Sequence, residues 1–159
     1  MSRQTERTDW SKVHEQVVDT FAGGWAEPHV HAWDDLLAED VELTQPLLAD
    51  ATGLGSYHDE VRRLLALAPD VRGDVLTWAG HGDVVLIELR ITGTAGRARV
   101  DFRTVDKLHI TPSAVVVRRE AFFDPSPVAK ALLTHPSSWL PWWRSGIGPL
   151  TGRRRFLRR

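Results

Sequence analysis

The chain has 159 residues and a formal net charge of -1, which is the size of one domain and gives no overall field to attract nucleic acid. With 42% hydrophobic and 26% charged residues, it has enough apolar side chains for a core. The absence of cysteine excludes disulfides, thiol nucleophiles, iron–sulfur clusters and thiolate zinc sites. No apolar run approaches the roughly 18 residues of a membrane helix and the polar start is not typical of a signal peptide, so we expect a cytoplasmic domain.

Helical periodicity dominates the first third of the chain. Apolar residues recur at helical spacing from about Ser11 towards Pro28, which predicts an amphipathic helix whose end is frayed by Gly23 and Gly24. A shorter helix is predicted around Trp33. A brief strand at 41–43 and a loop at 46–55 come next.

A third helix is predicted from Ser56 to the residue before Pro69. Ser56 and Asp59 have the spacing of a weak capping box, in which side chains accept or donate at the free backbone groups of the first turn. The apolar positions Tyr57, Val61 and Leu64 follow at helical spacing.

After Gly73 the period of the pattern changes to two, which is typical of strands. Strands are predicted at 74–79, 84–92, 98–110 and 114–123. The turns between them are so short that neighbouring strands must be antiparallel. A last helix is predicted at 128–133. The fold class is therefore α+β.

The strand that ends at Ile110 places a carboxylate on its apolar face. Its even-numbered positions are mostly apolar and its odd-numbered positions mostly charged, so Asp106 points into the core. A bare carboxylate is costly there, and its pKa should rise unless a partner is present.

Arg119 is the predicted partner. A turn at 111–113 that pairs Ile110 with Val115 sets Asp106 opposite Arg119. The same register sets Thr104 opposite Ala121 and Phe102 opposite Phe123. An acid and a guanidinium on one inner face indicate either a structural ion pair, which is the more common case, or the polar floor of a pocket.

Four stretches carry a family resemblance: 37–46, 53–56, 105–110 and 119–125. They resemble the nuclear transport factor 2-like superfamily, specifically its SnoaL-like polyketide cyclase and ketosteroid isomerase branch. The resemblance implies a conical barrel in which a curved, mainly antiparallel sheet packs on three N-terminal helices around a pocket. It also implies a homodimer that packs through the outer face of the sheet.

The resemblance also suggests roles for single residues. Asp106 matches the protonated aspartic acid that donates to the substrate oxyanion in ketosteroid isomerases, and Phe123 matches a pocket aromatic. Gln45 stands where those isomerases have their general base, and an amide cannot accept that proton. The isomerase tyrosine of the first helix is missing, since the only tyrosine is Tyr57. Ketosteroid isomerisation is therefore not expected.

The predicted function is cofactor-free acid/base chemistry of the cyclase, isomerase or hydrolase type on an apolar, carbonyl-type substrate. Asp106 and Arg119 are the predicted catalytic residues. The predicted substrate-binding residues are Trp25, Gln45, Phe102, Thr104 and Phe123. The alternative is a ligand-binding or association module without catalysis, because one fold hosts many functions.

Three histidines, His29, His31 and His14, could have a functional role, but a surface or core position explains each of them more simply. His29, His31 and Asp34 offer metal-ligand atoms, but without a further visible ligand they are expected to be surface residues, so no metal is predicted. His14 lies on the buried face of the first helix and is predicted to be a hydrogen-bonded core histidine, with the pocket mouth as the alternative.

The predicted domain covers 1–135, and a tail of tryptophans and arginines covers 136–159. Trp139, Trp142 and Trp143 precede a run of arginines at 153–159. Such a pattern occurs at membrane surfaces and nucleic-acid interfaces. We expect instead that 137–143 packs on the domain or on a partner subunit, because three solvated tryptophans expose too much apolar surface. The arginine-rich end is expected to stay mobile.

Overall fold

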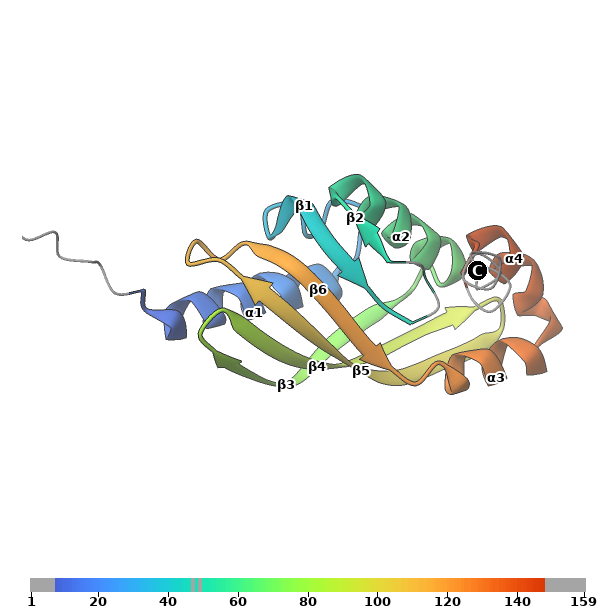
Figure 1. Ribbon diagram of the computed structural model, residues 1–159. Helices are drawn as coiled ribbons and strands as arrows, with labels where there is room; N and C mark the ends of the chain where they lie inside the picture. Colours follow the sequence, from blue (N-terminus) through green and yellow to red (C-terminus); the bar gives the residue numbers. More distant parts are fainter. Residues whose placement is uncertain (1–7, 47, 49, 148–159) are drawn as a thin grey trace, which may run out of the picture.

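The computed structural model describes residues 8–46, 48 and 50–147, and within them six strands form one twisted sheet (Figure 1). The strands are β1 (Leu37–Thr44), β2 (Ala51–Thr52), β3 (Arg72–His81), β4 (Val84–Ala95), β5 (Ala98–Ile110) and β6 (Val116–Phe123). Their order across the sheet is β2-β1-β6-β5-β4-β3. β1 pairs with β6 in parallel, whereas the other pairs are antiparallel, so the sheet is mixed and mainly antiparallel as predicted.

Helices lie on one face and at one end of this sheet. The helices are α1 (Trp10–Ala26), α2 (Leu54–Leu67), α3 (Ser126–Thr134), the 3₁₀ helix η1 (Pro136–Ser138) and α4 (Trp139–Ser145). The main core lies between α1, α2 and the inner faces of the strands, with Val17, Phe21, Val61, Ile87 and Leu108 among its buried members. The α+β class and the cone architecture are thereby confirmed. Among the described residues, no helix has the length and apolarity needed to cross a membrane.

The end of α1 differs from the prediction, because Gly23 and Gly24 lie within the helix rather than fraying it. The reason is a close contact with Trp33. A Cβ atom on Gly24 would lie 2.3 Å from Trp33 Nε1, so only glycine leaves room for this ring. The Trp33 indole is buried and donates a hydrogen bond to the carbonyl of Phe21 at 3.2 Å.

Replacing Gly24 by alanine is expected to lower the free energy of unfolding by about 1–3 kcal/mol, because the new methyl group overpacks a core that cannot give way. Gly23→Ala is the matched control. A Cβ there meets nothing within 4 Å, and alanine favours a helix by up to about 1 kcal/mol over glycine. Chemical denaturation of both variants measures the difference. Equal stabilities would show that the contact with Trp33 is unimportant.

The predicted second helix around Trp33 is wrong. Residues 30–36 form successive turns, with backbone hydrogen bonds from Ala32 to His29, from Asp34 to His31 and from Leu36 to Trp33. Each bond spans three residues, so the ladder of an α-helix does not form. The buried Trp33 ring fixes this segment through its own contacts, which sequence periodicity does not reveal.

The predicted start of α2 is also wrong. The helix begins at Leu54 after Gly53, whose φ of 97° lies in the region that glycine adopts without strain. Ser56 therefore lies inside the first turn. Its hydroxyl donates to the carbonyl of Thr52 at 2.9 Å and makes no capping bond.

The register of β5 and β6 is shifted from the prediction by two residues. Asp106 lies opposite Ala121 and Leu108 lies opposite Arg119, with a bulge between His109 and Ile110. The loop before β6 is longer than predicted, with Ala114 at a φ of 61°. A shift of two residues keeps each side chain on its face. Asp106 and Arg119 therefore still share the inner face, as diagonal neighbours.

The C-terminal helices pack against the end of the sheet (Figure 1). A second apolar cluster joins Leu67, Val100 and Leu132 to the half-buried Trp142 and Ile147. Trp139 and Trp143 remain 51% and 68% exposed. The expected packing of 137–143 on the domain is found at Ser138, which is fully buried, and at the half-buried Trp142, but much of the surface of Trp139 and Trp143 stays in solvent. The arginine-rich end lies outside the described residues.

Candidate functional site

A pocket of about 750 Å³, including its open mouth, lies between α2 and the inner face of the sheet. Its walls are mostly apolar and include Trp33, Leu64, Ile91, Phe102 and Phe123. Of the described residues that line it, five are polar: Gln45, Tyr57, Glu60, Thr104 and Arg119. A largely apolar pocket with a few polar groups is typical of small-molecule sites.

The structure brings the five predicted substrate-binding residues to this pocket. They are Trp25, Gln45, Phe102, Thr104 and Phe123. Phe102 and Phe123 form a wall in which the ring centroids are 5.1 Å apart. The indole nitrogen of Trp25 is buried and has no hydrogen-bond partner among the described residues.

The two predicted catalytic residues are placed differently from each other. Arg119 lines the pocket, whereas Asp106 is 0% exposed and lies behind it. Nε of Arg119 donates to Oδ2 of Asp106 at 3.0 Å, and Nη2 forms an ion pair with the same oxygen at 3.0 Å, while Thr104 Oγ1 is 3.5 Å from Oδ1. Asp106 therefore holds the guanidinium in place from the core side.

Burial and charge act in opposite directions on this pair. Burial raises the pKa of Asp106 above its ordinary range, although Arg119 works against this shift. Burial acts to lower the pKa of Arg119, but the nearby Asp106, together with Tyr57 and Glu60, raises it above its ordinary value. Arg119 is thus a fixed positive charge at the pocket wall.

Tyr57 extends the polar region along α2. Its ring lies beneath the Arg119 guanidinium, with 5.9 Å between Cζ and the ring centroid. The Trp33 ring meets it edge-on at 5.7 Å. Burial raises the pKa of Tyr57, so its hydroxyl keeps its proton across the physiological range.

Glu60 is the polar residue of the pocket that the sequence analysis missed. It lies one turn after Tyr57 on α2, and Oε2 accepts a hydrogen bond from Nε2 of Gln45 at 2.5 Å. Burial raises the pKa of Glu60, while Arg119 and then Gln45 oppose the shift. The sequence does contain an indication of this role. Glu60 lies three residues after Tyr57 and directly before Val61, so it interrupts the apolar stripe of the helix.

This arrangement can carry out acid/base chemistry. Glu60 offers a carboxyl group whose raised pKa suits proton exchange closer to neutral pH, and Gln45 fixes one of its oxygens. Arg119 offers a positive charge that can stabilise an oxyanion of a ligand. Gln45 itself cannot serve as a base, but it orients one.

A second apolar space of about 540 Å³ lies beside the first. The two share Leu64, Ile91, Phe102, Phe123 and Ile147 in their linings. Because Ile147 follows α4, the C-terminal segment contributes to the wall of both spaces.

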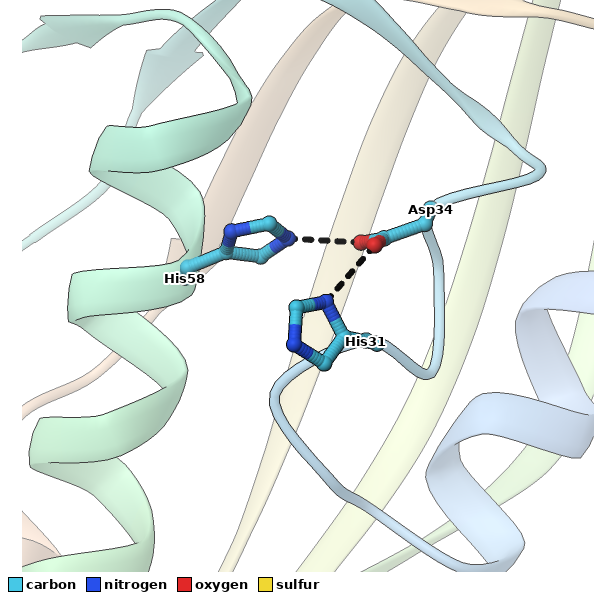
Figure 2. Close-up of side chains that lie close together, drawn as sticks. All are labelled: His31, Asp34 and His58. Carbon is cyan, nitrogen blue, oxygen red and sulfur yellow. Dashed lines mark hydrogen bonds and ion pairs between the residues drawn. The ribbon is translucent and has the colours of Figure 1, made fainter.

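The histidines lie outside this pocket. His14 is buried and its Nε2 lies 2.7 Å from the carbonyl oxygen of Gly82, which confirms the prediction of a core histidine. His31 and Asp34 meet His58 of α2, as Figure 2 shows, while His29 is exposed and lies outside the cluster. His58 is 24 residues away from Asp34 in sequence, so spacing alone did not indicate it.

Comparisons with known proteins agree with this geometry. Residues 17–117 match the family model described as the SnoaL-like domain. No curated protein gives a significant match. A protein from Jannaschia sp. described as a SnoaL-like polyketide cyclase has a TM-score of 0.68 at 16% identity, covering 83% of this chain and 99% of that one.

Two further solved structures share the fold. A Catenulispora acidiphila protein with a ketosteroid isomerase-like fold, in complex with trimethylamine, has a TM-score of 0.67 at 19% identity, covering 73% and 91% of the two chains. An LEH-like epoxide hydrolase of M. tuberculosis has a TM-score of 0.64 at 17% identity, covering 77% and 91%. At these identities the likeness concerns the fold.

Proposed function

We propose that this chain, which belongs to the SnoaL-like domain family of the nuclear transport factor 2-like superfamily, is an enzyme for cofactor-free acid/base chemistry on an apolar, carbonyl-type substrate. One observation carries the proposal. A carboxyl group with a raised pKa and a fixed guanidinium, Glu60 and Arg119, line the same largely apolar pocket.

In the proposed mechanism Glu60 is the acid/base. Its carboxylate takes a proton from the carbon next to the substrate carbonyl, and the electron pair moves onto the carbonyl oxygen. Glu60 then returns the proton at another position, which gives an isomerisation. Alternatively, the enolate carbon attacks a second carbonyl carbon of the substrate, the C=O π bond there opens, and the resulting alkoxide takes the proton from Glu60, which gives an aldol-type cyclisation. The apolar walls keep the carboxylate poorly solvated and therefore more basic.

Arg119 is the proposed partner of the developing oxyanion. Its charge is held at the wall by Asp106, so it needs little rearrangement when negative charge appears on the substrate. Because Asp106 has no exposed surface, we assign it an indirect role as the residue that positions Arg119. Trp25, Thr104 and the rings of Phe102 and Phe123 orient the apolar part of the substrate.

The second candidate function is ligand binding without catalysis. The hydrogen bond from Gln45 to Glu60 favours it, because a base that is already bonded at one oxygen has less freedom to exchange protons. The polyketide cyclase-like and epoxide hydrolase-like neighbours support the catalytic proposal as fold analogies only.

Turnover of nitrobenzisoxazole separates the two functions. A base removes its carbon-bound proton, its N–O bond breaks, and the product is a coloured phenolate whose charge Arg119 can stabilise. We expect saturable turnover by the protein. Saturable binding without turnover, followed by calorimetry, would support the binding module, and neither binding nor turnover would contradict a functional apolar pocket.

A homodimer through the outer face of the sheet is part of the proposal. Charged side chains of that face pair within one chain, Arg90 with Asp101 at 2.6 Å and Arg103 with Glu88 at 3.3 Å. They therefore do not require a partner. Support comes instead from the exposed apolar side chains Leu86, Val105 and Phe122 on this face, of which Val105 lies opposite Phe122.

Light scattering at micromolar concentration is expected to give the mass of a dimer, and Phe122→Glu is expected to give a monomer. Leu133→Glu is the matched control, because Leu133 is an exposed apolar residue on α3 and does not belong to the outer face of the sheet. A monomeric wild type, or a dimer that Leu133→Glu disrupts and Phe122→Glu does not, would contradict the sheet interface.

Three sequence predictions complete the proposal: a cytoplasmic location, no cofactor in the reaction and no nucleic-acid partner. We also propose that the chain divides into a cone domain at 1–135 and a tail at 136–159.

A further inference from the structure

Two histidines and an aspartate converge on the surface between the turn segment at 30–36 and α2. His31 Nδ1 lies 2.7 Å from Oδ2 of Asp34, and His58 Nε2 lies 2.6 Å from Oδ1 of the same carboxylate (Figure 2). The two imidazole rings meet edge-on, with centroids 4.6 Å apart. All the candidate ligand atoms lie within 4.8 Å of one another.

We propose that His31, Asp34 and His58 form a binding site for a divalent transition-metal ion of the zinc class. The proposal is independent of the proposed function, because none of the three lines the pocket. Two imidazole nitrogens and one carboxylate oxygen suit Zn²⁺, Co²⁺ or Ni²⁺, whereas Mg²⁺ and Ca²⁺ prefer oxygen ligands alone.

The geometry needs only small adjustments to hold an ion. Bond lengths of about 2.0–2.1 Å in a tetrahedral site place ligand atoms about 3.3 Å apart. The present N–O distances of 2.6 and 2.7 Å would therefore open slightly, and all the ligand atoms already lie within 4.8 Å of one another. Water would complete the coordination, since the site is open to solvent on the side of the 64%-exposed His31 side chain.

Metal binding replaces two hydrogen bonds by coordinate bonds. Each nitrogen that now faces Asp34 donates a proton to it, so each neutral imidazole must move this proton to its other ring nitrogen before it binds an ion. Asp34 contacts both histidines through its two oxygens, so its carboxylate already faces the space between them.

A metal ion bound by His31, Asp34 and His58 would stabilise the pocket wall from its outer side. His31 and Asp34 flank Trp33, while His58 lies between Tyr57 and Glu60 in the sequence of α2, and Trp33, Tyr57 and Glu60 all line the pocket. The ion would thus connect two segments that carry pocket residues. Since it binds the folded state only, it would raise the melting temperature.

Titration of the untagged protein with ZnCl₂ near neutral pH, followed by calorimetry, tests the proposal. We expect one equivalent to bind with micromolar or tighter affinity, and excess Mg²⁺ not to compete. His31→Ala and His58→Ala are each expected to weaken binding by on the order of tenfold or more. His29→Ala is the matched control, because this exposed histidine of the same segment lies outside the cluster.

Cobalt gives a second readout that does not depend on stability. Co²⁺ bound to the wild type is expected to show the intense visible absorption of a four-coordinate site, and His31→Ala is expected to lose it. His31 is the most exposed ligand, so this variant should keep the wild-type circular dichroism. Absence of stoichiometric Zn²⁺ binding, or equal affinity in His31→Ala and His29→Ala, would overturn the proposal and leave a hydrogen-bonded cluster.

Discussion

Replacing Arg119 by alanine is expected to lower the free energy of unfolding near neutral pH by about 3–5 kcal/mol, because the variant leaves the Asp106 carboxylate buried without a counter-charge. Asp106 is 0% exposed and both of its close guanidinium contacts come from Arg119. The nearest other polar group, Thr104 Oγ1 at 3.5 Å, is too distant to replace them. Urea denaturation of the wild type and the variant measures the loss.

Arg118→Ala is the matched control. Arg118 precedes Arg119 on β6, but its guanidinium lies at the surface, 2.6 Å from Glu42. Exposed pairs of this kind contribute about 0–1 kcal/mol. Losses of the same size in the two variants would contradict the buried-charge explanation.

The loss in Arg119→Ala is expected to depend on pH. Without the guanidinium, burial of Asp106 is opposed only by the Thr104 contact, so the folded-state pKa of Asp106 rises further above the ordinary value of 3.8. Between these two values the folded state binds a proton that the unfolded state does not, and stability therefore increases as the pH falls. The deficit relative to the wild type should be smaller at acid pH than at alkaline pH.

Glu60→Gln is expected to reduce proton abstraction from nitrobenzisoxazole by about 10²–10⁴-fold, the contribution of a positioned general base. The amide has the shape of the carboxyl group and can still bond to Gln45, so the pocket should keep its form. Binding of the phenolate product, which relies on Arg119 and the apolar walls, should change little. Initial rates and product inhibition measure the two effects separately.

Glu15→Gln is the control for Glu60→Gln, because Glu15 is an exposed glutamate of α1 outside the pocket. Its turnover should equal that of the wild type. If Glu60→Gln retains wild-type turnover, the base lies elsewhere in the pocket and the assignment of Glu60 is wrong.

Alternation of residue types was the strongest guide to the sheet. The bounds of β5 were predicted to the residue, because its charged odd positions and mostly apolar even positions persist over its whole length. The same alternation placed Asp106 inside. The register with β6 was not predictable, since a bulge at His109 and Ile110 depends on the loop conformation around Ala114.

The residues of the site were only partly predictable, because some of them meet through contacts between segments that are distant in the sequence. Trp25, Gln45 and Phe123 were assigned to the pocket from the family resemblance and the strand pattern, and they line it. Glu60 was missed because the helix was described by its apolar residues alone. His58 was not predicted to belong to the histidine cluster, because its contact with Asp34 depends on how the turn segment at 30–36 packs against α2.

The pH dependence of kcat/KM for nitrobenzisoxazole tests most directly the claim that Glu60 is the base of an apolar pocket. The account predicts that the rate rises with pH around a midpoint above 4.5, the ordinary pKa of glutamate, because burial raises the pKa of Glu60 and only the ionised carboxylate accepts the proton. Glu60→Gln should lose this rise. A midpoint at or below 4.5, or an unchanged profile in Glu60→Gln, would contradict the account.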